Sequence, residues 1–390
     1  MPDWLDQLRS DLLHKQKASV LRSLHVGDRC ARMVRRDGRQ LINLASNDYL
    51  GLASHPRLVE AVAQAAQRWG VGAGSSRLVG GHLEIHERLE QRFAAFKHAQ
   101  AALLTPTGYM ANLAAITALA GEGDAIFLDK LCHASLIDAA RMSGAEIRVF
   151  PHRNLDKLAR LLDRYGAARR RLIVTDAVFS MDGDCADLPE LCELRDRHEA
   201  ILIVDEAHAT GLLGATGSGL AEHQGVTGRV DVTISTAGKA LGSLGGMITA
   251  TRLVIDTIIN SARSFLYTTA APPTQAAAID AALDVLRDEP DRRSHLTELS
   301  LWMRCRLRQA GWQIAEDSTP IIPLIVGDNA AALALASALQ CAGYFAPAIR
   351  PPTVAPGVAR VRLSLRSDLA KRDLEGLIEA IGSPAALSYE

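Results

Sequence analysis

The sequence lacks the features that would place the chain in a membrane, on nucleic acid or outside the cell. Nowhere among its 390 residues does an uninterrupted apolar run reach the roughly 18 residues of a membrane-spanning helix. The formal net charge is −1, so no bulk charge favours nucleic acid or a membrane surface. The N-terminus, Met1-Pro2-Asp3-Trp4, has an early acidic residue and no apolar secretory segment. We therefore expect a cytoplasmic protein without nucleic-acid or membrane partners.

Metal-binding and nucleotide-binding patterns are also missing. The six cysteines are scattered and form no C-x-x-C pair, which excludes a disulfide framework and a zinc site. No G-x-x-x-x-G-K-[ST] loop accompanies the D-E-A-H at 205–208, so a helicase is excluded. His82 and His86 stand one helical turn apart, but no third ligand is evident. We predict a solvated helix face there and no metal. The cysteines are Cys30, Cys132, Cys185, Cys192, Cys305 and Cys341.

From about residue 100 the sequence alternates short apolar runs with helical patterns. This alternation is typical of an α/β fold with a mostly parallel sheet covered by helices. No internal repeat interrupts it, which excludes a solenoid. The predicted strands are 101–105, 125–128, 146–150, 171–176, 201–205, 230–235 and 247–250, and the helices between them include 109–120, 134–142, 154–165 and 188–198.

The two ends of the chain show other patterns of apolar and polar residues. An amphipathic helix is predicted over 3–24, and a helical stretch over 272–310 is broken by Pro290. Strand 321–326 and the alternating 359–365 then indicate a small α+β domain, since alternation means one covered and one solvated face. We predict an N-terminal arm over 1–45, a large domain over 46–287 and a small C-terminal domain over 288–390.

One lysine lies at the centre of the predicted chemistry. Lys239 stands in a loop of small residues, S-T-A-G-K-A-L-G, directly after the predicted strand 230–235. Asp205 ends a fully apolar strand, and His208 follows three residues later. Ligands of open α/β sheets bind at the carboxyl ends of the strands. A lysine, an aspartate and a histidine together there favour a cofactor held as an imine, with pyridoxal 5′-phosphate (PLP) the first candidate. Asp205 would keep the pyridine nitrogen protonated, and His208 would bind the phenolic oxygen.

Further candidates allow two interpretations each. Gly108 opens a helix after a strand and suits a phosphate, although such turns are common without ligands, and Tyr109 beside it could be ordinary packing. His133 could cover a cofactor ring or simply cap a helix. Arg350 in A-I-R-P-P-T could bind a carboxylate or stack on the prolines, and Arg22 lies on the amphipathic arm.

Taken together, four motifs in one order resemble the α-oxoamine synthases. The motifs are D-x-L-x-H-A-S at 129–135, F-S-M-D-G-D at 179–184, D-E-A-H-x-x-G-x-x-G at 205–214 and T-x-G-K at 236–239. That family consists of PLP enzymes of the aspartate-aminotransferase fold (fold type I), which condense an amino acid with an acyl thioester. The resemblance runs from about residue 20 to 380. It implies a homodimer with shared active sites, in which Thr268 or Thr269 reaches the neighbour's phosphate.

The resemblance also implies a role for each matching residue. Lys239 carries the cofactor as an imine, His133 covers its ring, Asp205 faces the pyridine nitrogen and His208 the phenolic oxygen. One departure stands at Asp176-Ala177, where relatives carry the longer glutamate, and this puts its hydrogen-bonding role in question. Phosphate and cofactor-pocket contacts fall to Gly108, Tyr109, Ser180 and Thr236, and substrate contacts to Arg22, His133, Arg350 and Thr353.

Three shorter motifs indicate the reaction within that family. S-N-D-Y-L-G-L at 46–52, L-Y-T-T-A-A-P-P at 266–273 and A-I-R-P-P-T-V at 348–354 resemble the members that join L-alanine to a pimeloyl thioester in biotin biosynthesis. The alternatives are a glycine C-acetyltransferase and a member that takes serine or another acyl donor. The pimeloyl carrier, acyl carrier protein or coenzyme A, stays open.

Overall fold

The computed structural model describes residues 3–24, 26–27 and 31–384, so Cys30 lies outside the described residues. The chain forms two compact units. The large unit comprises Leu50–Ser180 and Asp184–Ser294. The small unit takes in the described residues up to Tyr49, the short segment Met181–Gly183, and those from His295 onward. The three-part division expected from the sequence stays a prediction.

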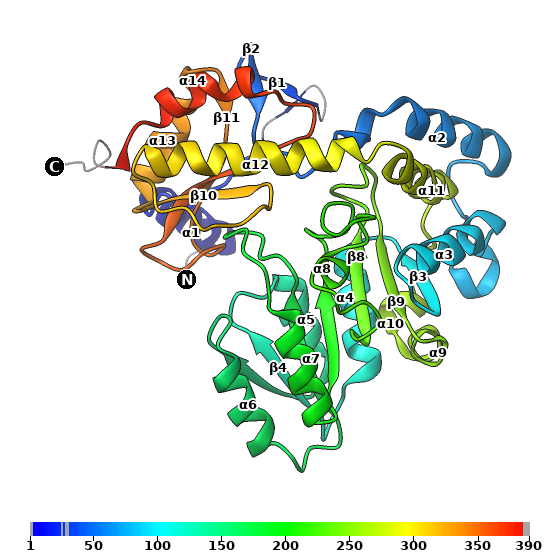
Figure 1. The fold of residues 1–390 in the computed structure, drawn as a ribbon. Coiled ribbons are helices and arrows are strands. Elements are labelled where there is room, and N and C mark those ends of the chain that lie inside the picture. Colours follow the sequence, from blue (N-terminus) through cyan, green and yellow to red (C-terminus); the bar gives the residue numbers. More distant parts are fainter. Residues whose placement is uncertain (1–2, 25, 28–30, 385–390) are drawn as a thin grey trace. The chain divides into compact units, whose positions relative to one another are not determined.

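A seven-stranded sheet forms the centre of the large unit (Figure 1). Its strand order is β3-β9-β8-β7-β6-β4-β5, with β9 antiparallel to both of its neighbours and the remaining pairs parallel. Every residue of β3, β4 and β9 is buried, as expected of apolar runs covered on both faces. The predicted α/β class is confirmed. The strands are β3 Ala101–Thr105, β4 Ala125–Asp129, β5 Glu146–Phe150, β6 Arg171–Asp176, β7 Ile201–Asp205, β8 Val232–Thr236 and β9 Gly246–Ala250.

Helices connect these strands and cover the sheet. Helix α4 contributes Ala111, Ala115 and Ile116 to the main core, where they meet strand residues such as Ile234. Small alanine side chains allow the helix to approach the sheet closely. The helices of this unit are α2 Pro56–Trp69, α3 Glu84–Phe96, α4 Gly108–Leu119, α5 Ala134–Ser143, α6 Leu155–Arg164, α7 Leu188–Arg197, α8 Leu220–His223, α9 Arg252–Ser261, α10 Arg263–Leu266 and α11 Pro273–Asp288, with a 3₁₀ turn at Leu52–Ser54 and a π turn at Arg77–Gly81.

The small unit contains two three-stranded sheets with the orders β1-β2-β11 and β10-β13-β12. Strands β1 and β2 form a hairpin through Asp37 and Gly38, whose φ angles are +49° and +75°. An Asp-Gly pair suits such a turn because both residues tolerate positive φ. The elements are α1 Trp4–Lys17, β1 Met33–Arg36, β2 Arg39–Asn43, α12 Asp291–Gln309 (which begins in the large unit), β10 Ile321–Gly327, α13 Asn329–Cys341, β11 Tyr344–Phe345, β12 Ala348–Ile349, β13 Ala359–Ser364 and α14 Lys371–Ile381.

Helix α1 ends earlier than the sequence suggested. It stops at Lys17, not at residue 24, because Ser19 adopts a φ of +56° that no right-handed helix accommodates. The backbone N–H groups of Val20 and Leu21 then both bond to the carbonyl of Lys15. The apolar residues expected on one face of this amphipathic helix are all exposed within the chain: Trp4, Leu5, Leu8, Leu12 and Leu13.

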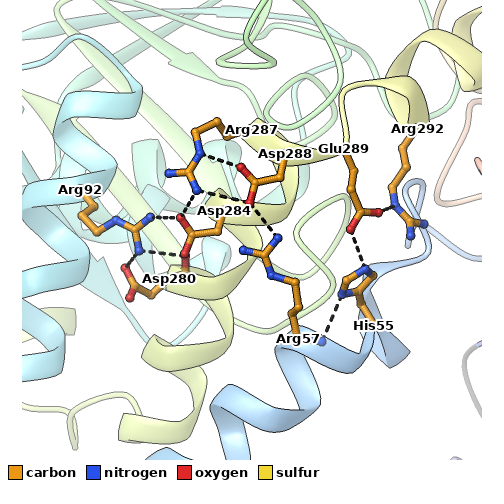
Figure 2. A network of polar contacts seen from close by, with 9 residues as sticks. All are labelled: His55, Arg57, Arg92, Asp280, Asp284, Arg287, Asp288, Glu289 and Arg292. Carbon is orange, nitrogen blue, oxygen red and sulfur yellow. Dashed lines mark hydrogen bonds and ion pairs between the residues drawn. The ribbon is translucent and has the colours of Figure 1, made fainter.

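A network of ion pairs joins α2, α3, α11 and the start of α12 in the large unit (Figure 2). Arg92 on α3 binds Asp280 and Asp284 on α11 at 2.6 and 2.7 Å. Arg57 on α2 binds Asp288 at 2.9 Å. Partly exposed pairs contribute little individually and are screened by salt, so packing between α2 and α11 provides most of the cohesion. The other members are His55, Arg287, Glu289 and Arg292. Among the described residues, no helix has the length and apolar character needed to cross a membrane.

Candidate active site

Polar residues gather at one edge of the large sheet. Strands β4, β6, β7 and β8 run parallel, so their carboxyl ends meet at the same edge. Asp129, Asp176, Asp205 and Thr236 are the last residues of these four strands. This edge is where open α/β sheets place ligand chemistry. The residues predicted to hold the cofactor therefore lie on neighbouring strand ends.

The lysine amine is held in a tight turn after β8. Lys239 Nζ lies 2.9 Å from Nε2 of His208, a buried side chain. The turn needs glycine at Gly242, where φ is +64° and an added Cβ would stand 2.5 Å from the backbone of Leu52. The backbone thus fixes where the amine is presented. His208 and Lys239, predicted separately from the sequence, are brought into contact.

The carboxylate of Asp205 is buried and held at both oxygens. Its Oδ1 accepts the N–H of Ala207 at 2.8 Å, and its Oδ2 accepts Nδ2 of Asn112 at 2.7 Å. The Asn112 amide also donates to Ser135 Oγ at 2.8 Å. Sequence reasoning missed Asn112, although it is a fully buried polar residue in the otherwise apolar helix α4. Such an isolated polar residue on a buried face was the available signal.

His133 is a helix cap and a site residue at once. It is the N-cap residue of α5, its Nδ1 lies 2.7 Å from Ser135 Oγ, and its backbone N–H donates to Asp176 Oδ2 at 2.8 Å. Burial, together with the positive charge of Lys239, lowers the pKa of His133, so the ring is neutral near pH 7. A neutral flat ring suits the predicted cover for a cofactor.

Asp176, the residue that departs from the family pattern, keeps a defined hydrogen-bonding role. Despite its shorter side chain it accepts the His133 N–H. Burial and the neighbouring charge of Asp205 raise the pKa of Asp176 well above its usual value. Asp176 thus anchors the backbone of His133.

The start of α4 and the end of β8 lie against each other. A Cβ added to Gly108 would stand 3.1 Å from Cβ and 3.2 Å from Oγ1 of Thr236, so glycine lets the helix start and the strand end approach each other closely. Thr236 Oγ1 in turn accepts the N–H of Gly238 at 3.2 Å. Backbone N–H groups at the start of a helix suit a phosphate. Tyr109 is exposed and its hydroxyl bonds to Asp138, and Ser180 is partly buried.

The remaining candidates form a cluster within the small unit. Arg22 Nη2 donates to Thr353 Oγ1 at 3.0 Å, and Arg350 donates to the carbonyl of Ser19. Burial and the charge of Arg22 lower the pKa of Arg350. Arg22, Arg350 and Thr353 are therefore neighbours although 331 residues separate Arg22 from Thr353.

The prediction of a solvated histidine face is wrong for His86. Its ring is fully buried, with Nδ1 accepting the N–H of Leu83 at 3.0 Å and Nε2 donating to the carbonyl of Ala271 at 2.8 Å. Burial lowers the pKa of His86 to about 4. His82 is exposed as expected. No group of three or more potential metal ligands occurs in the described part of the chain.

A further histidine ties together the loops that carry His133 and Ser180. The ring of His152 bonds to Asp129 at 3.0 Å through Nδ1 and to Asp184 at 2.8 Å through Nε2. Both nitrogens must carry hydrogen for both bonds to form. Although burial opposes the charge, the two carboxylates prevail and raise the pKa of His152 to about 9. The ring is therefore charged at neutral pH.

This pair of ion pairs predicts a pH-dependent stability. Because the pKa of His152 is raised in the folded protein, its ion pairs stabilise the fold fully below about pH 6.5. This contribution to stability is lost as the pH rises through about 9. His152→Gln is therefore expected to destabilise the protein at pH 6.5, and the deficit is expected to shrink by up to about 3 kcal/mol toward pH 9.5. Denaturant unfolding at both pH values measures this, with the exposed His223→Gln as control. A deficit that grows with pH would contradict the assignment.

Comparison with known proteins places these residues in a family. The sequence pattern of the family described as aminotransferase class I and II matches residues 39–381. The chain is 46% identical over 380 residues to the 8-amino-7-oxononanoate synthase of Anaeromyxobacter dehalogenans, covering 97% of this chain and 95% of that one. The chain belongs to the 8-amino-7-oxononanoate synthases of this family. The Burkholderia thailandensis member is 47% identical over 361 residues, with 91% of each chain covered.

Solved structures of two PLP-dependent enzymes share the fold. A serine palmitoyltransferase from Sphingomonas wittichii superposes with a TM-score of 0.93 at 30% identity, covering 99% of this chain and 98% of that one. The 8-amino-7-oxononanoate synthase of Francisella tularensis gives 0.78 at 27% identity, with coverages of 90% and 98%. Fold type I of the PLP-dependent enzymes is confirmed.

The cofactor of the 8-amino-7-oxononanoate synthases is PLP, and the residues present fit it. A lysine amine, a buried carboxylate with both oxygens oriented, and a neutral imidazole lie on neighbouring strand ends. The backbone N–H groups at the start of α4, beside Thr236, suit the phosphate. Lys239, Asp205, His133 and His208 match the donor and acceptor chemistry of the lysine linkage, ring nitrogen, ring face and phenolic oxygen.

Proposed function

We propose that the protein condenses L-alanine with a pimeloyl thioester, releasing CO₂ and the thiol and forming 8-amino-7-oxononanoate for biotin biosynthesis. The observation that carries the proposal is identity of 43% or more to synthases of this name over nearly the whole chain. The contact between Lys239 and His208 beside a buried Asp205 supports it.

The protein's residues orient the reaction and move its protons. When bound, PLP withdraws electrons from the α-carbon of alanine, which permits deprotonation and later loss of CO₂. Lys239 Nζ removes the α-proton and returns a proton at the end. Asp205 stabilises positive charge at the ring nitrogen, and Asn112 keeps its carboxylate in place. His133 covers the ring. Because His133 is neutral, Asp205 balances the positive charge at the ring nitrogen.

The small-unit cluster is proposed to hold the substrate carboxylates. Arg350 would bind the alanine carboxylate through its fork of donors, with His133 on the same substrate. Arg22 and Thr353, already bonded to each other, would contact the pimeloyl donor. The acyl carrier, acyl carrier protein or coenzyme A, decides what else the donor contacts.

A homodimer is proposed to complete the site. Large apolar side chains near the π turn are exposed within the chain, and monomeric proteins rarely expose such patches. Thr269 is also exposed, and either Thr268 or Thr269 is proposed to reach the phosphate of a second copy. Light scattering during gel filtration tests the dimer, and a monomer at working concentration would reject it. The exposed residues are Val71, Leu78, Val79 and Tyr267. The cytoplasmic location stays a prediction.

One experiment tests the reaction. Purified protein is mixed with L-alanine, glycine or L-serine and with pimeloyl-coenzyme A, pimeloyl-acyl carrier protein or acetyl-coenzyme A. Mass spectrometry is expected to detect 8-amino-7-oxononanoate with alanine and a pimeloyl donor only. Product from glycine and the acetyl donor alone would replace the proposal with glycine C-acetyltransferase activity.

Arg22 is expected to act on the donor and not on alanine. Arg22→Ala removes binding shared by ground and transition states, so KM for the donor rises while kcat changes little. A charged hydrogen bond contributes at most about 1.5–3 kcal/mol, which limits the rise to about 10- to 150-fold. Steady-state kinetics with each substrate varied separately measures this. An unchanged donor KM, or weaker alanine binding, would leave Arg22 a packing residue.

A further inference from the structure

Glu206, the residue next to Asp205, has no role in the chemistry above and yet is almost fully buried. Its side chain is 2% exposed, and its Oε2 accepts Lys97 Nζ at 2.5 Å, a lysine whose side chain is 4% exposed. Lys97 follows directly after α3. A buried ion pair thus lies beside the loop that carries both Asp205 and His208.

Every hydrogen of the Lys97 ammonium has an acceptor. Besides Glu206, Nζ donates to Thr210 Oγ1 at 2.8 Å and to the carbonyl of Ser218. The second oxygen of Glu206 accepts the N–H of Ala221 at 2.9 Å. An ammonium has three donors and all three are used here. The pair therefore holds the segment 206–221 from both of its ends.

The same contacts reach the strand that precedes Lys239. Thr210 Oγ1 lies 2.8 Å from Ser235 Oγ, and Ser235 is followed by Thr236 at the end of β8. Glycine at position 219 allows the backbone to approach Glu206 closely, because a Cβ there would stand 1.9 Å from Glu206 Oε2. One continuous chain of buried polar contacts thus runs from Lys97 through Thr210 to the β8 end.

We propose that Lys97 and Glu206 are positioning residues that fix the Asp205–His208 loop relative to Lys239. Apolar residues of similar volume can replace a buried ion pair without loss of stability, so stability alone does not explain the pair. Its contacts instead specify one loop geometry. The proposal concerns cofactor binding directly and depends on the proposed function only for the activity measurement.

The double variant Lys97→Met/Glu206→Gln tests the proposal without leaving an unpaired buried charge. Misplacing reacting groups by about 1 Å can cost about 100-fold in rate, so kcat is expected to fall about 10- to 100-fold with little change in either KM. Titration of the PLP-free protein with PLP is expected to show weaker binding. The pH midpoint of the visible absorption of bound PLP is expected to shift, since His208 and Asp205 relax away from Lys239.

A matched control separates positioning from general destabilisation. Asp124 is a fully buried carboxylate paired with Arg169 and Arg170 at 2.8 and 3.0 Å, at the start of β4 and so at the opposite end of the sheet. Asp124→Asn is expected to lower the thermal midpoint while leaving kcat, PLP affinity and the absorption midpoint unchanged. The single variant Thr210→Val keeps the volume and the Lys97–Glu206 pair and removes only the hydroxyl contacts to Lys97 and Ser235, so it is expected to show a smaller loss than the double variant.

The outcomes are distinct. Wild-type PLP affinity and absorption midpoint in a folded double variant would overturn the proposal, as would equal losses in the Asp124→Asn control. If the double variant does not fold, the same two measurements on Thr210→Val decide in the same way. PLP binding and its spectrum need no substrate, so these results stand even if the protein makes a product other than 8-amino-7-oxononanoate.

Discussion

Lys239→Ala is expected to abolish measurable condensation. The variant removes both the attachment point of PLP and the base that takes the α-proton. Loss of a positioned general base alone lowers the rate by about 10²–10⁴-fold. The contact with His208 would be lost as well. Product formation with alanine and a pimeloyl donor measures the effect.

Chemical trapping provides the control for this variant. Borohydride is expected to fix PLP covalently to one peptide of the wild-type protein, the one that contains Lys239, and to none in Lys239→Ala. Lys157→Ala, at an exposed lysine on α6, is expected to behave as wild type in both assays. Recovery of the label on another lysine, or activity within tenfold of wild type, would refute the assignment.

Asp205→Asn is expected to fold and bind PLP but to lower kcat by about 100-fold or more. The substitution keeps the shape of the side chain and removes the charge that stabilises the protonated ring nitrogen. Removing one preorganised electrostatic partner costs about 10²–10³-fold in other enzymes. The Asn112 amide would also meet an amide where it now meets a carboxylate oxygen. Single-turnover kinetics of α-proton exchange from alanine isolates the affected step.

A carboxylate just before β8, which binds the opposite end of β7, serves as the comparison. Asp231 Oδ2 accepts the N–H of Leu202, near the start of β7, at 2.8 Å. Asp231→Asn is expected to leave kcat within a few-fold of wild type, because it changes strand anchoring and not the ring environment. If Asp205→Asn loses no more activity than Asp231→Asn, Asp205 is structural only.

The elements that sequence patterns predicted best are those with a strong local cause. The strand at 101–105 was predicted with its full bounds because an uninterrupted apolar run can be satisfied by a sheet covered on both faces. The hairpin strand Met33–Arg36 was missed because it is short, ends in two arginines and has one buried residue, Val34. The N-terminal helix was overextended because periodicity alone does not report a positive φ at Ser19.

Among the residues of the candidate site, too, those with a strong local sequence signal were predicted and those with a weak signal or none were missed. Lys239, Asp205 and His208 could be predicted because strand ends in a parallel sheet share an edge, so local patterns imply their proximity. For Asn112 the sequence offered only an isolated polar residue on a buried helix face, and for Lys97 no signal, because each acts through a partner about 100 residues away and spacing carries no information about such pairs. His86 was misjudged because a polar residue beside charged ones suggests solvent, whereas its partner is a distant carbonyl.

The antiparallel position of β9 has a consequence for synthesis of the chain. Strand β3 pairs with no strand other than β9 in its sheet, and Ala101 lies opposite Ala250. During translation β3 therefore has no partner strand until about 150 further residues have been synthesised. The edge of β8 that pairs with β9 is also unpaired until then. Unpaired edges and late, long-range contacts slow folding and favour aggregation. A ribosome-stalled fragment ending before residue 246 is therefore expected to depend on chaperones, whereas one that has released β9 is not.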